Sequence, residues 1–304
     1  MQPLESKRYL VEASLSVRTV HRYRKAVLEF LDWCDSYHLD PSSPLQLDDA
    51  LTNFIHFLFE SGRGKALAQS VLYGIHFYIP QWKQLLPLAS KSITGWDKQS
   101  PSTSYPPLTW DLAVLIAVRL ARSSSFAMGV GLLLAFDCFL RLNELIAISY
   151  FDVSDTADAR LGSQFQGMHI RLAATKTGRE QSVRVHDPAV EALVRQLLRA
   201  SRRKPFPFSA NDFRRCFHSA CSALHLPTGF VPHSLRHGGA TMWFLQGRSM
   251  EDIMHRGRWA SSKTARRYVQ AGRALLIKQD IPSSVKADAA LLSRSLLRAM
   301  ALTQ

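Results

Sequence analysis

Four side chains suited to phosphate chemistry lie close together in the last quarter of the sequence. His233 and Arg236 are three residues apart, Trp259 follows, and Tyr268 comes nine residues later. They supply an imidazole, a guanidinium, an indole N–H and a phenol. A phosphodiester resists attack because its negative oxygens repel nucleophiles, so a catalyst has to neutralise them, aim a nucleophile and protonate the leaving oxygen. This set of side chains predicts that chemistry.

Three residues upstream add what the set lacks. Arg141 follows an apolar run, and its planar guanidinium suits two phosphate oxygens. Glu144 comes three residues later, a spacing that by itself is typical of an ordinary helical ion pair. Lys176 lies at a predicted hairpin turn, where a lysine alone is normally a solvated charge. The sequence shows no carboxylate cluster typical of a Mg²⁺ site, so we expect neither a metal nor another cofactor.

The residue types leave alternatives open. Trp259 can donate a hydrogen bond but cannot accept a proton, and a tryptophan of the core is the other interpretation. Tyr268 has to be activated by nearby positive charge because a phenol has a pKa of ~10, whereas most tyrosines are packing residues. His233 and Arg236 can share one helix face, which suits a proton carrier beside a phosphate clamp.

The order and spacing of these residues resemble the tyrosine recombinase, or phage integrase, family, and the similarity covers residues 109–269. The resemblance implies that Tyr268 attacks a DNA phosphate and forms a 3′-phosphotyrosyl link, while Lys176 protonates the leaving 5′ oxygen. It implies that the transition state is stabilised by Arg141, His233, Arg236 and Trp259, with Glu144 in a supporting role. Many family members have histidine where this chain has Trp259, which favours phosphate binding over proton transfer there.

Two segments refine the resemblance. Leu235–Thr241 and Arg256–Trp259 are most similar to recombinases of eukaryotic mobile elements, such as DIRS-like retroelements and cryptons. The implied activity is site-specific recombination or integration without ATP. Two alternatives stay open. One is a type IB topoisomerase, although that family usually has lysine where this chain has His233. The other is a recombinase-derived DNA-binding protein without catalysis.

The resemblance also implies partners. It implies double-stranded DNA and a homo-oligomer on that DNA, expected to be a tetramer that works through a Holliday junction. A tail helix at 286–304 is predicted to dock on a neighbouring protomer, with packing on its own domain as the alternative. Candidate DNA-binding residues are Arg18, Arg22, Lys25, Arg179, Arg266 and Arg267.

The positive charge is concentrated in the second part of the chain. The formal net charge is +14, but residues 1–100 carry 11 Lys and Arg against 10 Asp and Glu, whereas residues 101–304 carry 27 against 14. A domain this basic attracts polyanions, with nucleic acid the leading candidate. A basic enzyme with solvated charges would show the same excess, so charge alone leaves both interpretations open.

The four cysteines indicate an intracellular protein with reduced thiols, because none forms a C-x-x-C pair in a chain of this size. A zinc site on one predicted helix is less favoured than packing, because the spacing of Cys216, His218, Cys221 and His225 fits no standard pattern. No secretory signal or membrane span is visible. We expect a nuclear protein if the element is eukaryotic, and otherwise one of the cytoplasm or nucleoid.

Hydrophobic periodicity predicts a mainly α protein with a small antiparallel sheet. The pattern divides the chain into a helical bundle at 1–97, a Pro- and Ser-rich linker at 98–108, a larger domain at 109–285 and the tail helix. The resemblance implies that the bundle is a core-binding domain that clamps DNA and that the larger domain is catalytic. The predicted helices cover 16–39, 47–59, 66–78, 109–148 with a break near 123–125, 188–203, 211–224, 236–245, 250–255 and 262–269. Strands at 168–175 and 181–185 flank a turn at 176–179.

Overall fold

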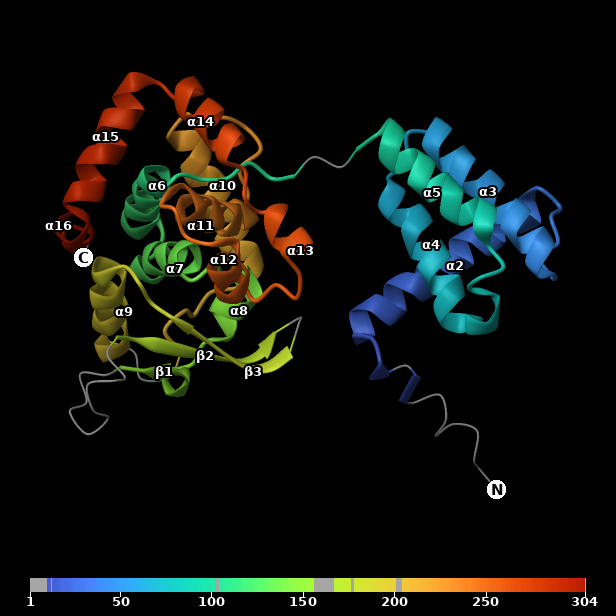
Figure 1. Cartoon of the computed structure of the whole chain (residues 1–304), viewed down its shortest axis with the longest axis horizontal. Helices are drawn as coiled ribbons and strands as arrows, with labels where there is room; N and C mark the ends of the chain where they lie inside the picture. The colour runs from blue at the N-terminus through green and yellow to red at the C-terminus, as the bar shows by residue number, and fades with distance from the viewer. Residues whose placement is uncertain are drawn as a thin grey trace. The chain divides into compact units, whose positions relative to one another are not determined.

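The computed structural model describes residues 10–11, 13–101, 104–155, 167–175, 178–200 and 204–303, and of residues 173–175 and 178–180 it describes the backbone alone. The chain divides into two compact units, Met1–Thr103 and Ser104–Gln304 (Figure 1). Across these described ranges, no helix combines the length and the apolar character that a membrane crossing requires.

The first unit is a bundle of helices. Its main elements are α2 (Val17–Ser36), α3 (Pro44–Glu60), α4 (Lys65–Tyr78) and α5 (Pro87–Gln99). Hydroxyl groups cap two of them, because Ser16 accepts from the Thr19 N–H and Ser43 accepts from the Gln46 N–H. The apolar helix faces meet in a core whose most buried members include Phe30, Leu51, Phe54 and Leu58. The helices predicted at 16–39, 47–59 and 66–78 are therefore confirmed.

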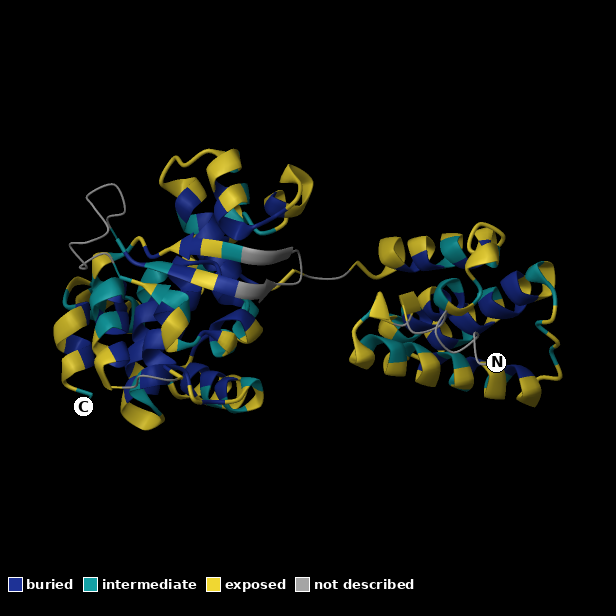
Figure 2. Cartoon of the chain, turned by 90° about the horizontal axis from the view of Figure 1, so that it is seen from below, coloured by how far each residue is buried: buried dark blue, intermediate teal, exposed yellow. Residues whose placement is uncertain are grey.

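The second unit is built around α7 (Phe126–Asp137), which is buried from Ala127 to its end. A helix that is apolar on every side needs cover on every side, and α6 (Trp110–Ser123) packs along it. Figure 2 shows buried residues gathered inside this unit and exposed residues on its outer faces. The helices that follow are α8 (Leu142–Ala147), α9 (Pro188–Ala200), α10 (Ala210–Ala223), α11 (His233–Leu245), α12 (Met250–Gly257), α13 (Ser262–Arg266) and α14 (Ala271–Asp280).

A small antiparallel sheet lies along one side of the second unit (Figure 1). Its strands are β1 (Val153–Ser154), β2 (His169–Thr175) and β3 (Gly178–Arg184), in the order β1-β2-β3. Ile170 pairs with Val153 on one side and with Val183 on the other, and both Ile170 and Val183 face the core. The predicted fold class, mainly α with a small antiparallel sheet, is confirmed.

Several predicted boundaries are wrong. The two helical stretches predicted over 109–148 are three helices: the predicted break near 123–125 separates α6 from α7, and the chain also turns between α7 and α8. β3 begins at Gly178, inside the predicted turn. β1 is too short for periodicity to detect, and the apolar residues of α14 do not lie on one face, because Leu275 and Leu276 are exposed whereas Ala274 is buried.

The linker is shorter at both ends than the predicted range of 98–108. α5 continues to Gln99, and Pro106 to Leu108 are buried in the second unit. The Leu108 N–H donates to the Ser234 carbonyl at 3.2 Å. Proline and serine content indicated a linker, but the apolar end of the segment covers the start of α11.

The tail also differs from the single helix predicted at 286–304. It forms α15 (Ser283–Arg294) and α16 (Leu296–Ala301), which meet at Ser295. Both helices pack against α6 of the same chain, and Leu296 and Met300 lie in the core of the second unit. The apolar residues that predicted docking on a neighbour are used within their own domain.

Two glycines bring α11 unusually close to other backbone segments. A Cβ on Gly238 would lie 2.0 Å from the Leu108 carbonyl oxygen, and one on Gly239 would lie 2.3 Å from the Phe136 carbonyl oxygen. Both distances are far shorter than a carbon–oxygen contact permits. The glycine pair therefore fixes α11, and the residues it carries, against the end of α7.

We predict that Gly238→Ala lowers the free energy of unfolding by roughly 1–3 kcal/mol or more, because the new Cβ meets backbone that cannot move aside. The measurement is urea unfolding of the full chain, followed by circular dichroism. The matched control is Gly272→Ala on α14, where a Cβ meets nothing within 4 Å. That variant is expected within about 0.5 kcal/mol of the parent. Equal effects of both changes would contradict the close approach.

Candidate active site

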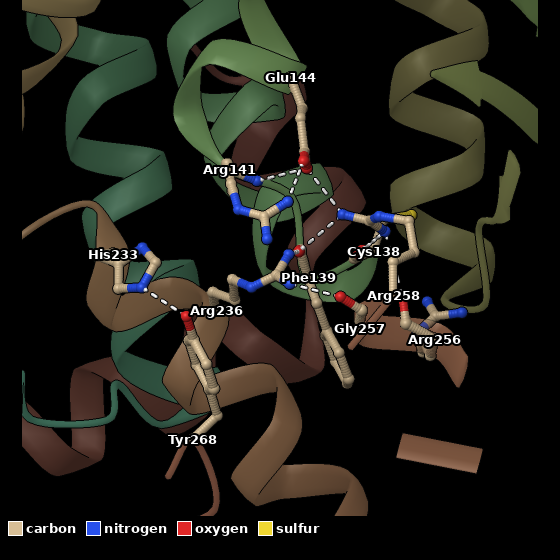
Figure 3. Close-up of polar contacts among 10 residues, drawn as sticks. All are labelled: Cys138, Phe139, Arg141, Glu144, His233, Arg236, Arg256, Gly257, Arg258 and Tyr268. Carbon is tan, nitrogen blue, oxygen red and sulfur yellow. Dashed lines mark hydrogen bonds and ion pairs between the residues drawn. The ribbon is translucent and has the colours of Figure 1, made fainter. Parts of the chain in front are cut away.

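A tight turn after α7 supplies the acceptor around which the site is built. Phe139 has a φ of +49°, in the left-handed region that side chains rarely adopt, and the Leu140 N–H returns to the Ala135 carbonyl at 3.0 Å. The turn leaves the Phe139 carbonyl free of the helix ladder. Two guanidinium groups, those of Arg236 and Arg258, donate to this one oxygen (Figure 3).

Arg236 is completely buried, at 0% exposure, although it carries a charge. Its Nη1 donates to the Phe139 carbonyl and its Nη2 to the Gly257 carbonyl. Its Cζ lies 4.6 Å from the ring centroid of Trp259 and 5.4 Å from that of Tyr268. Carbonyls and aromatic faces thus hold the cation without a direct carboxylate partner among the described residues.

Glu144 joins two further arginines. Arg141 is the residue just before α8, and its backbone N–H donates to Glu144 Oε2 at 2.9 Å while its Nη1 pairs with Oε1. On the other side, Arg258 Nη2 lies 2.7 Å from Oε2, with both side chains 4% exposed. The Arg141 side chain is 23% exposed. Arg141 is therefore the guanidinium of this group that reaches the surface.

The phenol of Tyr268 lies beside Arg236, whose Cζ is 5.4 Å from the centre of its ring. Its hydroxyl is 3.3 Å from His233 Nε2 (Figure 3). Its ring lies 4.5 Å from the His237 ring at an angle of 25°, and 4.5 Å from the Trp259 ring at 34°. The His237 ring is held in turn by Gln270, whose Nε2 lies 2.9 Å from Nδ1. Stacking on both sides therefore fixes where the hydroxyl points.

The site is strongly positive and poor in solvent. Burial, and then the charges of Arg236 and Arg141, lower the pKa of His233 to about 4. Burial, followed by Arg141 and Arg258, lowers the pKa of Arg236. Burial raises the pKa of Glu144, but Arg258 and the hydrogen bonds from Arg141 outweigh it and leave that pKa below its ordinary value. An anion placed here would relieve the repulsion among the cations.

A pocket of about 660 Å³ opens beside this cluster. Arg141 and His233 line it from one side, and Arg214 and His218 on α10 line it from another. Tyr105 also lines the pocket, and its ring meets that of His233 edge-on at 5.9 Å. The pocket gives an anion access to the exposed edge of Arg141 and to His233.

The structure brings six of the predicted site residues into one cluster. They are Arg141, Glu144, His233, Arg236, Trp259 and Tyr268. Lys176 lies outside the described residues, and of Arg179 only the backbone, in β3, is described. Arg266 and Arg267 are exposed beside Tyr268, and the exposed residues of α2 include Arg18, Arg22 and Lys25.

Arg236 and Trp259 are more deeply buried than a phosphate-binding role predicts. Arg236 was expected to clamp a phosphate, but both its terminal nitrogens are bonded to carbonyls and no part of it is exposed. The Trp259 ring packs on Gly257 and is 6% exposed, as in a core tryptophan. Its Nε1 has no hydrogen-bond partner within the described part of the chain.

Sequence reasoning missed two buried arginines. Arg256 donates from Nε to the Asp137 carbonyl and from Nη1 to the Arg184 carbonyl, both at 3.0 Å. Arg258 contacts Glu144 directly. Both flank Gly257 just before Trp259, a segment that the sequence analysis used only for the resemblance. The signal available in the sequence was the pair of arginines on either side of Gly257 at the end of a predicted helix.

No metal site is visible among the residues that the structure describes, since no group of three or more His, Cys, Asp or Glu side chains is placed to hold an ion. This includes the cysteines and histidines of α10. Burial raises the pKa of the Cys221 thiol to about 12, as expected of a packing residue.

Comparison with known proteins establishes the family. The profile of the phage integrase family matches residues 116–274, more than half of the 304 residues. The chain therefore belongs to the phage integrase family, whose members are the tyrosine recombinases. Among curated proteins, none matches this sequence.

Solved structures show the same fold. A lambda integrase dimer bound to a COC′ core site has a TM-score of 0.61 and 16% identity, over 88% of this chain and 76% of that one. A lambda integrase tetramer bound to a Holliday junction gives 0.61 and 15%, over 87% and 75%. The Tn1549 transposon integrase in complex with circular intermediate DNA gives 0.56 and 12%, over 75% and 84%. The predicted recombinase fold is confirmed.

The buried histidines make stability depend on pH. Burial and His233 lower the pKa of His237 to about 4, whereas an unfolded histidine has a pKa near ~6.5. The folded chain therefore binds fewer protons, so this stabilisation is complete above about pH 6.5 and is lost as the pH falls towards 4. The largest loss is ~1.4 kcal/mol per pH unit for such a group.

We predict that His237→Asn makes the free energy of unfolding fall less steeply than in the parent between about pH 6.5 and 4, because one buried group no longer titrates. Urea unfolding at a series of pH values measures this slope. Asparagine keeps an acceptor for Gln270. The exposed His255→Asn is the control and should keep the parent slope. A slope unchanged in His237→Asn would contradict the prediction.

Proposed function

We propose that this protein is a site-specific DNA recombinase that cleaves and rejoins DNA through a covalent phosphotyrosyl intermediate. The observation that carries the proposal is the position of Tyr268, whose hydroxyl lies 3.3 Å from His233 Nε2 and whose ring centroid lies 5.4 Å from the Cζ of the buried Arg236. A phenol placed between a proton acceptor and a cation is arranged for attack on a phosphorus centre.

In the cleavage step, Tyr268 Oη forms a bond to the scissile phosphorus and the bond from phosphorus to the 5′ oxygen breaks. His233 is neutral at pH 7, because its pKa is lowered to about 4, and its Nε2 takes the phenolic proton. Lys176 gives a proton to the leaving 5′ oxygen. The products are a 3′-phosphotyrosyl link and a free 5′-hydroxyl.

The buried cations stabilise the charge that develops on the phosphoryl oxygens. Arg141 contacts the phosphate from the exposed side of the pocket, while Arg236 acts from below the phenol with its carbonyl partners holding it in place. Donors fixed before the reaction need no reorganisation during it. In the second step a 5′-hydroxyl from a partner duplex attacks phosphorus and releases Tyr268, so one phosphoester replaces another and no ATP is consumed.

We propose double-stranded DNA as the partner and a tetramer as the active assembly. Support comes from the basic second unit, from exposed Arg266 and Arg267 next to Tyr268, and from the fold shared with lambda integrase, solved as a tetramer on a Holliday junction. Arg18, Arg22 and Lys25 form an exposed basic face on α2 that would lie along phosphates. Assembly through the tail would require α15 and α16 to leave α6.

Two segments, Leu235–Thr241 and Arg256–Trp259, suggest a subgroup of recombinases for this protein. We propose a recombinase of a eukaryotic mobile element, acting in the nucleus. Support is the arginine–glycine–arginine–tryptophan sequence at 256–259, in which the Gly257 carbonyl accepts from Arg236 and the Trp259 ring lies 4.5 Å from the Tyr268 ring.

We predict that the protein forms an SDS-resistant adduct with nicked DNA and that Tyr268→Phe abolishes it, because phenylalanine lacks the attacking oxygen. The probe is a pool of nicked duplexes with a randomised core, from which adducts are recovered and sequenced. The nick lets the short cleaved strand diffuse away, so the adduct accumulates.

Tyr105→Phe is the matched comparison, because Tyr105 is the other phenol beside His233. It should still form the adduct. Loss of the adduct in Tyr105→Phe but not in Tyr268→Phe would reassign the nucleophile. Relaxation of supercoiled plasmid without joining of two duplexes would favour a topoisomerase, and DNA binding without any adduct would favour a silent DNA-binding protein.

We predict that Lys176→Ala slows adduct formation by roughly 10²–10⁴-fold on ordinary DNA, because the leaving oxygen loses its proton donor. On DNA with a 5′-bridging sulfur the rate should return towards the parent rate, because a thiol has a pKa of ~8.5 and leaves without protonation. Single-turnover gel assays measure both rates. If the sulfur restores Arg179→Ala but not Lys176→Ala, Arg179 is the proton donor instead.

A further inference from the structure

Arg258 stands at a backbone position that favours glycine. It ends α12 with a φ of +57° and a ψ of 41°, in the left-handed region. Helices that end this way usually have glycine there, because a Cβ makes the conformation unfavourable. An arginine at this position indicates that its side chain is needed.

The Arg258 side chain is used entirely inside the protein. Its Nη2 contacts Glu144 Oε2 at 2.7 Å and the Phe139 carbonyl at 3.3 Å, and its Nη1 contacts the Cys138 carbonyl at 3.4 Å. With the side chain only 4% exposed, Arg258 has no surface with which to hold DNA. Its effect on a reaction has to pass through the groups it contacts.

Those groups connect Arg258 to Arg141 and to Arg236. Glu144, whose Oε2 faces Arg258, uses its Oε1 to hold Arg141 Nη1. The Phe139 carbonyl, the second partner of Arg258, also accepts from Arg236. Figure 3 shows Arg258 on the far side of Glu144 from Arg141, with Arg236 below.

Arg256 shows what a purely structural arginine looks like in the same segment. It is buried to the same degree: 8% of the whole residue is exposed, against 9% for the whole of Arg258. Its guanidinium also donates to carbonyls. Its carboxylate partner is Asp137, at 3.3 Å. Asp137 also accepts from the His186 N–H, just after β3. No contact of Arg256 reaches Glu144 or Arg141 among the described residues.

We propose that Arg258 is a positioning residue of the recombination reaction, which fixes the Glu144 carboxylate so that Arg141 stays aligned with the scissile phosphate. Through the shared Phe139 carbonyl it also keeps Arg141 and Arg236 at a constant separation. The inference rests on the proposed function, because it assigns Arg258 a role in aligning the phosphate-binding arginines.

The test uses the full chain and a nicked duplex recovered from the randomised pool, with single-turnover adduct formation followed as a function of pH. Arg258→Met keeps the length of the side chain and removes its charge. We expect adduct formation to slow roughly tenfold to a hundredfold, because Arg141 loses its fixed direction. Affinity for the same duplex should change less than threefold or so, since Arg258 is buried.

The pH dependence separates positioning from general stability. In the parent, Arg258 helps to keep the pKa of Glu144 low. Without it that pKa rises, so Glu144 takes up a proton at a higher pH and releases Arg141. Adduct formation by Arg258→Met should therefore decline at a higher pH than in the parent as the solution is acidified.

Arg256→Met is the control for loss of a buried guanidinium. It should lower thermal stability but leave the acid side of the rate profile where it is in the parent. Arg258→Lys should restore the acid side of the profile and part of the rate, because its charge still faces Glu144. If Arg258→Met does not fold, Arg258→Gly replaces it, since glycine suits the left-handed backbone.

The outcomes separate the two proposals. If the parent chain forms no adduct, the proposed function fails. If the parent forms an adduct, and a folded Arg258 variant matches it in rate and in acid profile, the positioning role is wrong. The role is also wrong if the Arg256 and Arg258 variants shift the profile equally.

Discussion

The site depends on one backbone carbonyl that accepts from two buried cations. Phe139 turns the chain in a left-handed conformation after α7, and its oxygen receives Arg236 from α11 and Arg258 from the end of α12. These segments lie about a hundred residues away in sequence. A carbonyl can hold a guanidinium without cancelling its charge. The turn at Phe139 therefore fixes the positions of the Arg236 and Arg258 guanidinium groups without neutralising their charge.

The charge balance around this carbonyl favours an anionic ligand. Glu144 is shared by Arg141 and Arg258, Asp137 pairs with Arg256, and Arg236 has carbonyl and aromatic partners. Among the described residues of this cluster, guanidinium groups thus outnumber carboxylates. Burial lowers the pKa of His233, and the charges of Arg236 and Arg141 lower it further. In the proposed function, a phosphodiester is the anion that would supply the missing negative charge.

Much of this arrangement could be predicted from residue types and spacing, and the exceptions have physical causes. The helices of the first unit follow apolar periodicity, and the six clustered site residues follow the order of their family. Periodicity carries no information on left-handed backbone, so the turn at Phe139 and the role of Arg258 were missed. The sequence left the surface on which the tail packs open, because an apolar stripe shows that a helix packs and does not show on which surface; within this chain the tail packs on α6.

The glycine pair of α11 also divides the site into parts of unequal mobility. Gly238 and Gly239 lock α11 onto neighbouring backbone, and this holds His233 and Arg236 with it. The segment that carries Tyr268 follows α13, a five-residue helix in which only Ala265 is buried. The position of the phenol therefore depends on ring stacking and on a short helix, whereas backbone packing holds the position of Arg236. Any control over when this protein reacts acts most easily on that short exposed segment, and least easily on the helix beneath it.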